Sequence, residues 1–363
     1  MSLALFRTLV RTSLATTKSD WTANARQQLS SATDLEWQQS LAALELHRLT
    51  QLVFYSLEAH GLTDIVPQPY LPRMQEAYRQ TRINNTILLL TLSRILQAMR
   101  EHDLHPVIWK GIALADSFYP DPGTRPMEDI DFAIPQDEMA KASAVFESLG
   151  FLPQDGAETE DAVYFANQMG AVCDVHHHVR LFEGKESMNL TTHLKPKHLK
   201  VPALPVLETN AMLVHLIFHL DGHRPDTGPL LCWILDVAFV LRKWGALLEP
   251  ERLEKLMPAK KHFISLLRTI RFLEQEFDEK LPECLAEAAK HFEPFTLAEI
   301  LRQRRLALWG LPRPRGWLRL GASRLGFRLR YHRPNLHMSD LLLWSADSVR
   351  NLRMDNQPIP KMG

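Results

Sequence analysis

The 363-residue chain has few cysteines, no long apolar run and no net charge. Its three cysteines lie far apart and form no CxxC pair, which argues against a zinc site and fits reduced thiols in the cytoplasm. No stretch of eighteen apolar residues occurs, so we expect no transmembrane helix. Arg7 and Arg11 interrupt the first apolar patch, which therefore does not have the order of a signal peptide.

The net charge of zero conceals an uneven distribution of arginine. Residues 302–339 contain ten arginines and no Asp, Glu or Lys, so the rest of the chain has an excess of ten acids. Aromatic residues lie between these arginines, and such a segment can bind phosphates or an anionic surface such as RNA. The alternative is a solvated helical segment whose arginines pair with acids elsewhere.

The apolar pattern predicts an α+β protein with helices before and after a region of strands. The N-terminal part is predicted to form two short helices within 34–60, which Gly61 ends, and a long helix over 72–102. The long helix is expected to place one apolar face on the core, made of Ile87, Leu88, Ile95, Leu96 and Met99. After residue 205 the pattern predicts only helices, at 208–220, 230–244, 251–256, 261–277 and 284–292.

The middle of the chain alternates between strand and helix patterns. Strands are predicted at 105–110, 130–135, 162–168 and 171–179, and helices at 111–119 and 137–150. The order β-α-β-α-β-β predicts a mixed sheet flanked by helices. We therefore divide the chain into an N-terminal helical region (1–103), an α/β core (104–204), a helical domain (205–300) and an arginine-rich C-terminal region (301–363).

Two carboxylates interrupt the apolar stretch RPMEDIDFAIP at residues 125–135. Alternate residues of a strand share a face, so Asp129 and Asp131 point the same way. Two like charges side by side in an apolar setting are unfavourable unless a cation neutralises them. Carboxylates bind Mg²⁺, with Mn²⁺ as the alternative, so the pattern predicts a metal site. The competing interpretation is a pair of acids that faces solvent at the end of a strand.

A third acid lies in the apolar stretch AVCDVHHHV. If this strand is a neighbour of 130–135, Asp174 joins Asp129 and Asp131, and His176 shares its face. Three such acids can hold two metal ions and deprotonate an attacking group.

The dipeptide Lys110-Gly111 stands between a strand and a helix, where phosphates bind in many proteins. Glycine lets the backbone approach a phosphate, and the start of a helix offers free N–H groups. No Walker A motif is present. Arg125 is also within reach of a triphosphate; alternatively, it is a loop residue that pairs with Asp121 or Glu128.

The stretch VIWKGIALADSFYPDPGTRPMEDIDFAIP resembles the signature of the uncharacterised nucleotidyltransferase family, a branch of the DNA-polymerase-β-like superfamily. The likeness is close over residues 105–150 and extends to VCDVHHH, which looks like the carboxylate-x-His strand of the family. Lys110-Gly111 occupies the place where most members of the superfamily have Gly-Ser.

This resemblance implies a fold, a reaction and a set of site residues. It implies that Asp129 and Asp131 bind Mg²⁺, with Asp174 as the third acid. Lys110, Gly111 and Arg125 are then expected around the nucleotide. The implied reaction moves a nucleoside monophosphate from an NTP to an acceptor and releases pyrophosphate. The acceptor is undefined, and an anionic one, such as RNA or a phosphorylated metabolite, would suit the arginines. The alternatives are a phosphotransferase on the same fold and a non-catalytic nucleotide-binding protein.

Two further groups give weaker signals. His215 and His219 share a helical face, but Leu216 stands where a zincin needs Glu, so core or interface histidines are favoured. Asp236 lies within a predicted apolar helix, where it either pairs with one of these histidines or faces the cleft.

Overall fold

The computed structural model describes residues 3–15, 20–154, 162–168, 170–176, 190–222, 229–257 and 259–308, all within one compact unit, Met1–Trp309. Residues 309–363, which hold most of the arginine-rich segment, lie outside the described part of the chain. The interpretation of that segment, and the division of the chain into four regions, therefore remain predictions.

The described helices lie before, within and after the strands. The α-helices are α1 (Leu3–Leu14), α2 (Asp20–Ser30), α3 (Asp34–Leu46), α4 (Thr50–Ala59), α5 (Leu71–Glu101), α6 (Lys110–Ser117), α7 (Met139–Ser148), α9 (Thr209–Gly222), α11 (Leu231–Trp244), α12 (Pro250–Leu256), α13 (Lys260–Phe277), α14 (Glu283–Lys290) and α15 (Leu297–Leu308). The short 3-10 helices are η1 (Thr63–Ile65), η2 (Pro122–Thr124), η3 (Gln136–Glu138) and η4 (Gly245–Leu247).

The strands form one seven-stranded mixed sheet in the order β3-β4-β5-β2-β1-β7-β6. They are β1 (Val107–Ile108), β2 (Ile130–Ala133), β3 (Phe151–Pro153), β4 (Ala162–Asn167), β5 (Val172–His176), β6 (Thr191–Leu194) and β7 (Leu204–Leu207). Strand β2 is parallel to β5 and antiparallel to β1, and β1 is parallel to β7. The predicted α+β class, a mixed sheet flanked by helices, is confirmed.

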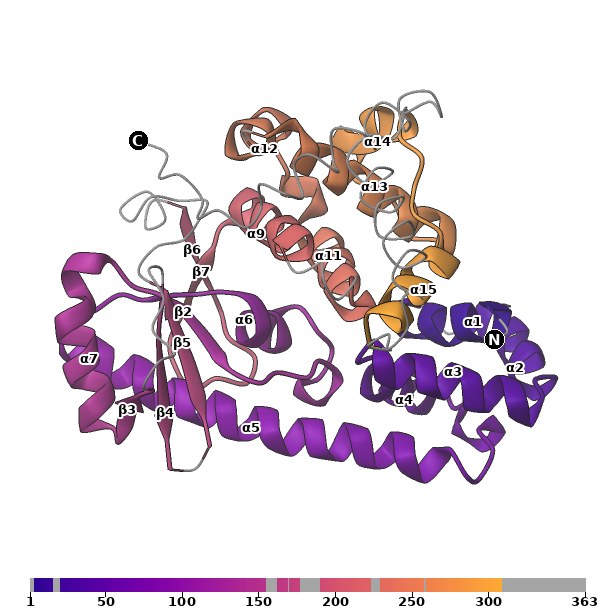
Figure 1. Ribbon diagram of the computed structural model, residues 1–363, viewed down its shortest axis with the longest axis horizontal. Helices are drawn as coiled ribbons and strands as arrows, with labels where there is room; N and C mark the ends of the chain where they lie inside the picture. The colour runs from indigo at the N-terminus through magenta and orange to yellow at the C-terminus, as the bar shows by residue number, and fades with distance from the viewer. Residues whose placement is uncertain are drawn as a thin grey trace, which may run out of the picture. The chain divides into compact units, whose positions relative to one another are not determined.

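An aromatic cluster fixes α7 on one face of the sheet. Phe146 of α7 lies 4.6 Å from Phe165 and 5.7 Å from Phe132, between ring centroids, and all three rings are fully buried. Figure 1 shows α7 on one side of the sheet and α6 on the other. Because side chains alternate along a strand, the neighbours of Phe132 and Phe165 point away from α7, toward the α6 side.

Helix α5 connects the sheet to the N-terminal helices, as Figure 1 shows. Its 31 residues span about 46 Å at 1.5 Å per residue. The predicted core face is largely correct, with Leu88, Ile95, Leu96 and Met99 buried, but Ile87 is 39% exposed because it lies on the flank of that face. Among the described residues, no helix has both the length and the apolar character needed to cross a bilayer.

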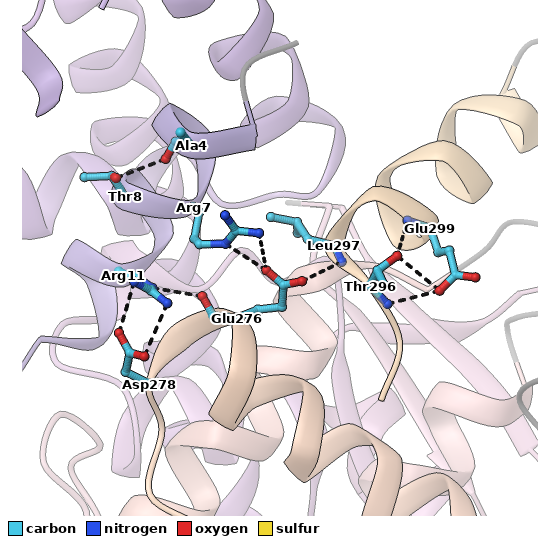
Figure 2. Close-up of polar contacts among 9 residues, drawn as sticks. All are labelled: Ala4, Arg7, Thr8, Arg11, Glu276, Asp278, Thr296, Leu297 and Glu299. Carbon is cyan, nitrogen blue, oxygen red and sulfur yellow. Dashed lines mark hydrogen bonds and ion pairs between the residues drawn. The ribbon is translucent and has the colours of Figure 1, made fainter. Parts of the chain in front are cut away.

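The arginines of the first apolar patch join α1 to helices far along the chain (Figure 2). Arg7 Nε donates to Glu276 Oε2 at 2.8 Å, and Arg11 Nε donates to the Glu276 carbonyl at 2.9 Å. The other carboxylate oxygen of Glu276 accepts the backbone N–H of Leu297 at 3.2 Å. One glutamate at the end of α13 therefore holds α1 and the start of α15 together.

Apart from the short 3-10 helices, six described elements were not predicted from the sequence: α1, α2, α15, β3, β6 and β7. The three strands have only three or four residues each, too few to show a clear alternation of apolar and polar residues. The last strand among the described residues, β7, ends at Leu207, close to residue 205, after which the sequence predicted only helices.

The loop that contains η2 packs so closely on α5 that glycine is required at position 123. A Cβ on Gly123 would lie 2.6 Å from Tyr78 Cε2 and 2.9 Å from Arg82 Cβ. Gly123→Ala should therefore lower the free energy of unfolding by about 1–3 kcal/mol, the usual effect of overpacking, as measured by urea denaturation. Gly222→Ala is the control, because nothing lies within 4 Å of its added methyl group. Equal stability of the two variants would contradict the close packing.

Candidate active site

Two buried carboxylates lie side by side on the face of the sheet opposite α7. Asp131 on β2 and Asp174 on β5 are direct partners in the parallel ladder. They are 4% and 6% exposed. The prediction that Asp174 lies on a strand adjacent to Asp131 is confirmed, since the register places the two carboxylates on one face.

Asp129 precedes β2 and is the third acid of this group. Burial raises the pKa of Asp129 to about 7, and the negative charge of Asp131 contributes to the same shift. Lys110 acts in the opposite direction, but does not cancel the rise. The three predicted acids are therefore electrostatically coupled, and at neutral pH Asp129 is poised between its two protonation states.

Lys110 is the first residue of α6 and pairs with the acids. Its ammonium lies 2.7 Å from Asp131 Oδ1, and its side chain is 18% exposed. Burial lowers the pKa of Lys110, but Asp131, Asp174 and Asp129 outweigh burial and raise it overall. The residue has φ of +46°, a left-handed conformation that costs a non-glycine residue about 1–2 kcal/mol. The strained backbone and the ion pair with Asp131 thus occur in the same residue.

His176 follows Asp174 on the same face of β5. Its Nε2 atom lies 3.0 Å from Asp174 Oδ2. One ligand atom each from Asp131, Asp174 and His176 lies within 4.8 Å of the others. Within the described part of the chain, Asp174 Oδ1 is buried without a hydrogen-bond partner. A buried carboxylate oxygen of this kind is suited to a cation, so the residues present fit a divalent metal ion.

Aromatic rings stand behind the acid cluster, and the sequence did not reveal them. Trp109, the residue before Lys110, packs edge-on against His176 at 5.1 Å and stacks on His215 of α9 at 4.8 Å. Burial lowers the pKa of His215 well below its ordinary value, and the nearby Lys110 adds to this effect, so the imidazole is neutral. The sequence favoured His215 as a core histidine, and at 8% exposure it is buried, but it lies next to the site.

Tyr164 is a second neighbour that the sequence did not reveal. It is the direct partner of Asp174 across the antiparallel pair of β4 and β5, so both side chains lie on the same face. Burial raises the pKa of the Tyr164 hydroxyl, and Asp174 adds to the shift. The sequence feature that could have revealed this pairing is the short connection between β4 and β5, which contains Gly170 with φ of +82° and is typical of a hairpin.

Arg125 is bound to Asp236, and among the described residues no contact joins it to the three acids. Its Nε and Nη2 atoms donate to the two carboxylate oxygens of Asp236 at 2.7 and 2.8 Å. Tyr119 donates its hydroxyl to the same carboxylate at 2.7 Å. Burial lowers the pKa of Arg125, but Asp236 outweighs burial and raises it, so the guanidinium keeps its charge. Asp236 thus pairs with Arg125, and not with His215 or His219.

Arg125 does not pair with Asp121 or Glu128, the alternative partners that the sequence suggested, because both acids have other partners. Asp121 accepts the Tyr78 hydroxyl at 2.9 Å, and Glu128 pairs with Arg48 at 2.5 Å. A Cβ on Gly111 would lie 3.0 Å from Arg125 Nη1, a tight contact, so glycine at position 111 lets the guanidinium lie against α6 without a shift. Binding of a nucleotide by Gly111 and Arg125 therefore remains a prediction, beside a structural role that both residues already have.

Comparison with known proteins gives one extensive match. The family model described as "Uncharacterised nucleotidyltransferase" matches residues 33–274, about two thirds of the chain. No curated protein sequence matches the chain.

Three solved structures resemble the fold at low identity. The crystal structure of ANT(2'')-Ia in complex with adenylyl-2''-tobramycin has 17% identity and a TM-score of 0.36, and covers 46% of this chain and 93% of that one. The solution structure of antibiotic-resistance factor ANT(2'')-Ia has 17% identity and a TM-score of 0.38, with 52% and 98% covered. An antigenic nucleotidyltransferase-like protein from Paracoccidioides brasiliensis has 15% identity and a TM-score of 0.35, with 55% and 95% covered. At these TM-scores the likenesses carry no argument about the acceptor.

Loss of Asp236 should destabilise the protein strongly. In Asp236→Ala the buried guanidinium of Arg125 keeps its charge and loses its carboxylate, which typically costs about 3–5 kcal/mol. Chemical denaturation measures the change. The matched control is Asp64→Ala, which breaks another two-point arginine–carboxylate pair, Arg26–Asp64, at the exposed surface and should have little effect. Similar losses for both variants would show that burial does not determine the strength of the Arg125 pair.

Replacement of Asp129 and of Asp131 by Asn should change the thermal stability in opposite directions, although the sequence pattern gives both acids the same role. With a pKa of about 7 against an ordinary 3.8, Asp129 favours the folded state at acidic pH, and this contribution is lost as the pH rises through 7. The metal-free Asp129→Asn protein should therefore gain melting temperature over the wild type between pH 5 and 7, and keep the gain at pH 8. Asp131→Asn should lose stability, because Lys110 loses its partner at 2.7 Å. Thermal melts with a chelator present test both, and an Asp129→Asn effect independent of pH would refute the assignment.

Proposed function

Because the chain belongs to the uncharacterised nucleotidyltransferase family, we propose that it transfers a nucleoside monophosphate from an NTP to a hydroxyl acceptor and releases pyrophosphate. The observation that carries this proposal is the pairing of Asp131 with Asp174 on adjacent buried strands, with Asp129 before the first and Lys110 beside it. Two acids on one face of the sheet, coupled to a third that precedes β2, are an unfavourable arrangement that a metal-dependent phosphate chemistry explains.

Asp129, Asp131 and Asp174 are proposed as the ligands of two Mg²⁺ ions, with Mn²⁺ as the alternative. When bound, the ions supply positive charge to the triphosphate and to the attacking and leaving oxygens. The unpartnered Oδ1 atom of Asp174 and the raised pKa of Asp129 support this assignment, since both describe carboxylates whose charge the protein does not fully neutralise.

Each of the remaining steps is assigned to a side chain of this protein. Asp174 accepts the proton of the acceptor hydroxyl. The hydroxyl oxygen forms a bond to the α-phosphorus, and the bond from the α-phosphorus to the pyrophosphate oxygen breaks. Lys110 neutralises the β- and γ-phosphates, together with the free N–H groups at the start of α6. To do so, the Lys110 ammonium leaves Asp131 and binds a phosphate oxygen. This exchange replaces one anionic partner with another.

Gly111 and Arg125 belong to the phosphate side of the proposal through the geometry of α6. Arg125 packs against Gly111 at the first turn of α6, and Asp236 holds the guanidinium in place. We propose that these residues keep the start of the helix at a fixed distance from the acids. A direct contact between Arg125 and the nucleotide would use Nη1, because Nε and Nη2 are bound to Asp236.

The acceptor and the compartment are the least constrained parts of the proposal. An anionic acceptor, such as RNA or a phosphorylated metabolite, fits the ten arginines of residues 302–339, which lie mostly outside the described residues. A cytoplasmic location fits Cys173, Cys232 and Cys284, which are all free thiols. Phosphoryl transfer, with release of a nucleoside diphosphate, is the alternative reaction at the same acids.

The reaction is tested with NTPs labelled on the α-phosphorus, a cell extract as the source of acceptor, and separation of the products. The wild type should transfer the label and release pyrophosphate. Asp129→Asn and Asp131→Asn should each lose at least about a hundredfold of this rate, roughly 2.7 kcal/mol of transition-state stabilisation. The control is Asp137→Asn, an exposed acid in η3, which should keep the rate. Release of a nucleoside diphosphate would support phosphoryl transfer, and no labelled product would support a non-catalytic role.

A further inference from the structure

The ligand atoms around Asp174 include a nitrogen as well as oxygens. His176 Nε2 lies 3.0 Å from Asp174 Oδ2, and an atom of Asp131 completes a group whose members are all within 4.8 Å of one another. Ligands about 2.1 Å from an octahedral ion are separated by about 3.0 Å when adjacent and about 4.2 Å when opposite. The 3.0 Å between His176 and Asp174 is the separation of adjacent ligands, and the limit of 4.8 Å for the whole group lies slightly above the separation of opposite ones.

The imidazole of His176 is held in this position by its surroundings. Trp109, which is 1% exposed, contacts the ring edge-on at 5.1 Å between centroids, and His215 is stacked on Trp109. Asp174 lies two residues earlier on the same strand and face. The His176 side chain is 21% exposed, so part of the imidazole faces solvent.

We propose that His176 is a direct ligand, with Asp131 and Asp174, of one divalent ion, and that this position takes a first-row transition-metal ion in preference to Mg²⁺. Mg²⁺ binds oxygen ligands and water, whereas an imidazole nitrogen favours transition metals. The inference rests on the proposed function for what the ion does, but the ligand set itself does not depend on the reaction.

The competing arrangement has the same geometry without a metal–nitrogen bond. If Nε2 carries the proton, His176 donates a hydrogen bond to Asp174 and only orients that carboxylate. Loss of His176 would then weaken the binding of Mg²⁺ and of a transition metal alike. In the proposed arrangement, loss of His176 weakens mainly the binding of the transition metal. Comparison of the two metals therefore distinguishes the two arrangements.

The direct test uses Mn²⁺ as the probe, with the full chain free of any polyhistidine tag and without nucleotide, because a purine nitrogen would give the same signal. Pulsed electron paramagnetic resonance should detect a directly coordinated ¹⁴N nucleus on bound Mn²⁺. His176→Gln keeps a hydrogen-bonding group near the position of Nε2 but offers no imidazole, so the ¹⁴N signal should disappear. His215→Gln, on the other side of Trp109, should retain it. A wild-type protein that binds Mn²⁺ without ¹⁴N coupling overturns the proposal.

Binding measurements provide a second, independent readout. Loss of even an outer partner of a metal ligand typically weakens binding 10–100-fold, so His176→Gln should weaken Mn²⁺ binding by at least about tenfold in calorimetry. Mg²⁺ binding should change much less. Equal losses for both ions would assign His176 to the orienting role and contradict the proposal. Transfer of labelled nucleotide with Mg²⁺ is measured separately, so failure of the proposed reaction would not be mistaken for failure of this inference.

Discussion

The mutual repulsion of buried carboxylates is the constraint around which the centre of this protein is organised. Asp131 and Asp174 occupy paired positions on adjacent strands, and Asp129 stands at the start of the first. The protein offsets part of this charge with Lys110, which enters α6 in a strained left-handed conformation. The fold therefore accepts strain in the backbone and a shifted acid together, a combination that is typical of sites maintained for chemistry and not for stability.

A second group of buried charges, the Arg125–Asp236 pair, connects the elements around the site. The Arg125–Asp236 pair connects the loop before β2 to α11, while the close approach of Arg125 to Gly111 connects the same loop to α6. The two arrangements have opposite characters. The carboxylates of the sheet are left with excess negative charge, whereas the arginine pair is fully matched and joined by Tyr119. The first has the excess charge on which our proposal of a metal site rests, and the second connects the elements that surround it.

The sequence predicted what depends on local pattern, and failed where distant segments meet. Asp131 and Asp174 were found because each interrupts an apolar strand, and acids in that setting need a common explanation. The partner of Arg125 was missed because Asp236 lies 111 residues away, and nothing local distinguishes it from other acids. Tyr164, Trp109 and His215 were missed as neighbours of the site for the same reason: strand register and helix docking decide which of many aromatic residues lie there.

The contact between the first helix and Glu276 has a consequence for the order in which the protein assembles. Arg7 and its partner are separated by 269 residues, so α1 leaves the ribosome long before α13 exists. At about 5–20 residues per second, synthesis of the intervening chain takes roughly 10–50 s. During that interval α1 has neither Glu276 nor the start of α15 to contact. The helix can therefore pack on α2, α3 and α4 early, whereas the contacts of Arg7 and Arg11 with Glu276 form only in a late step of assembly.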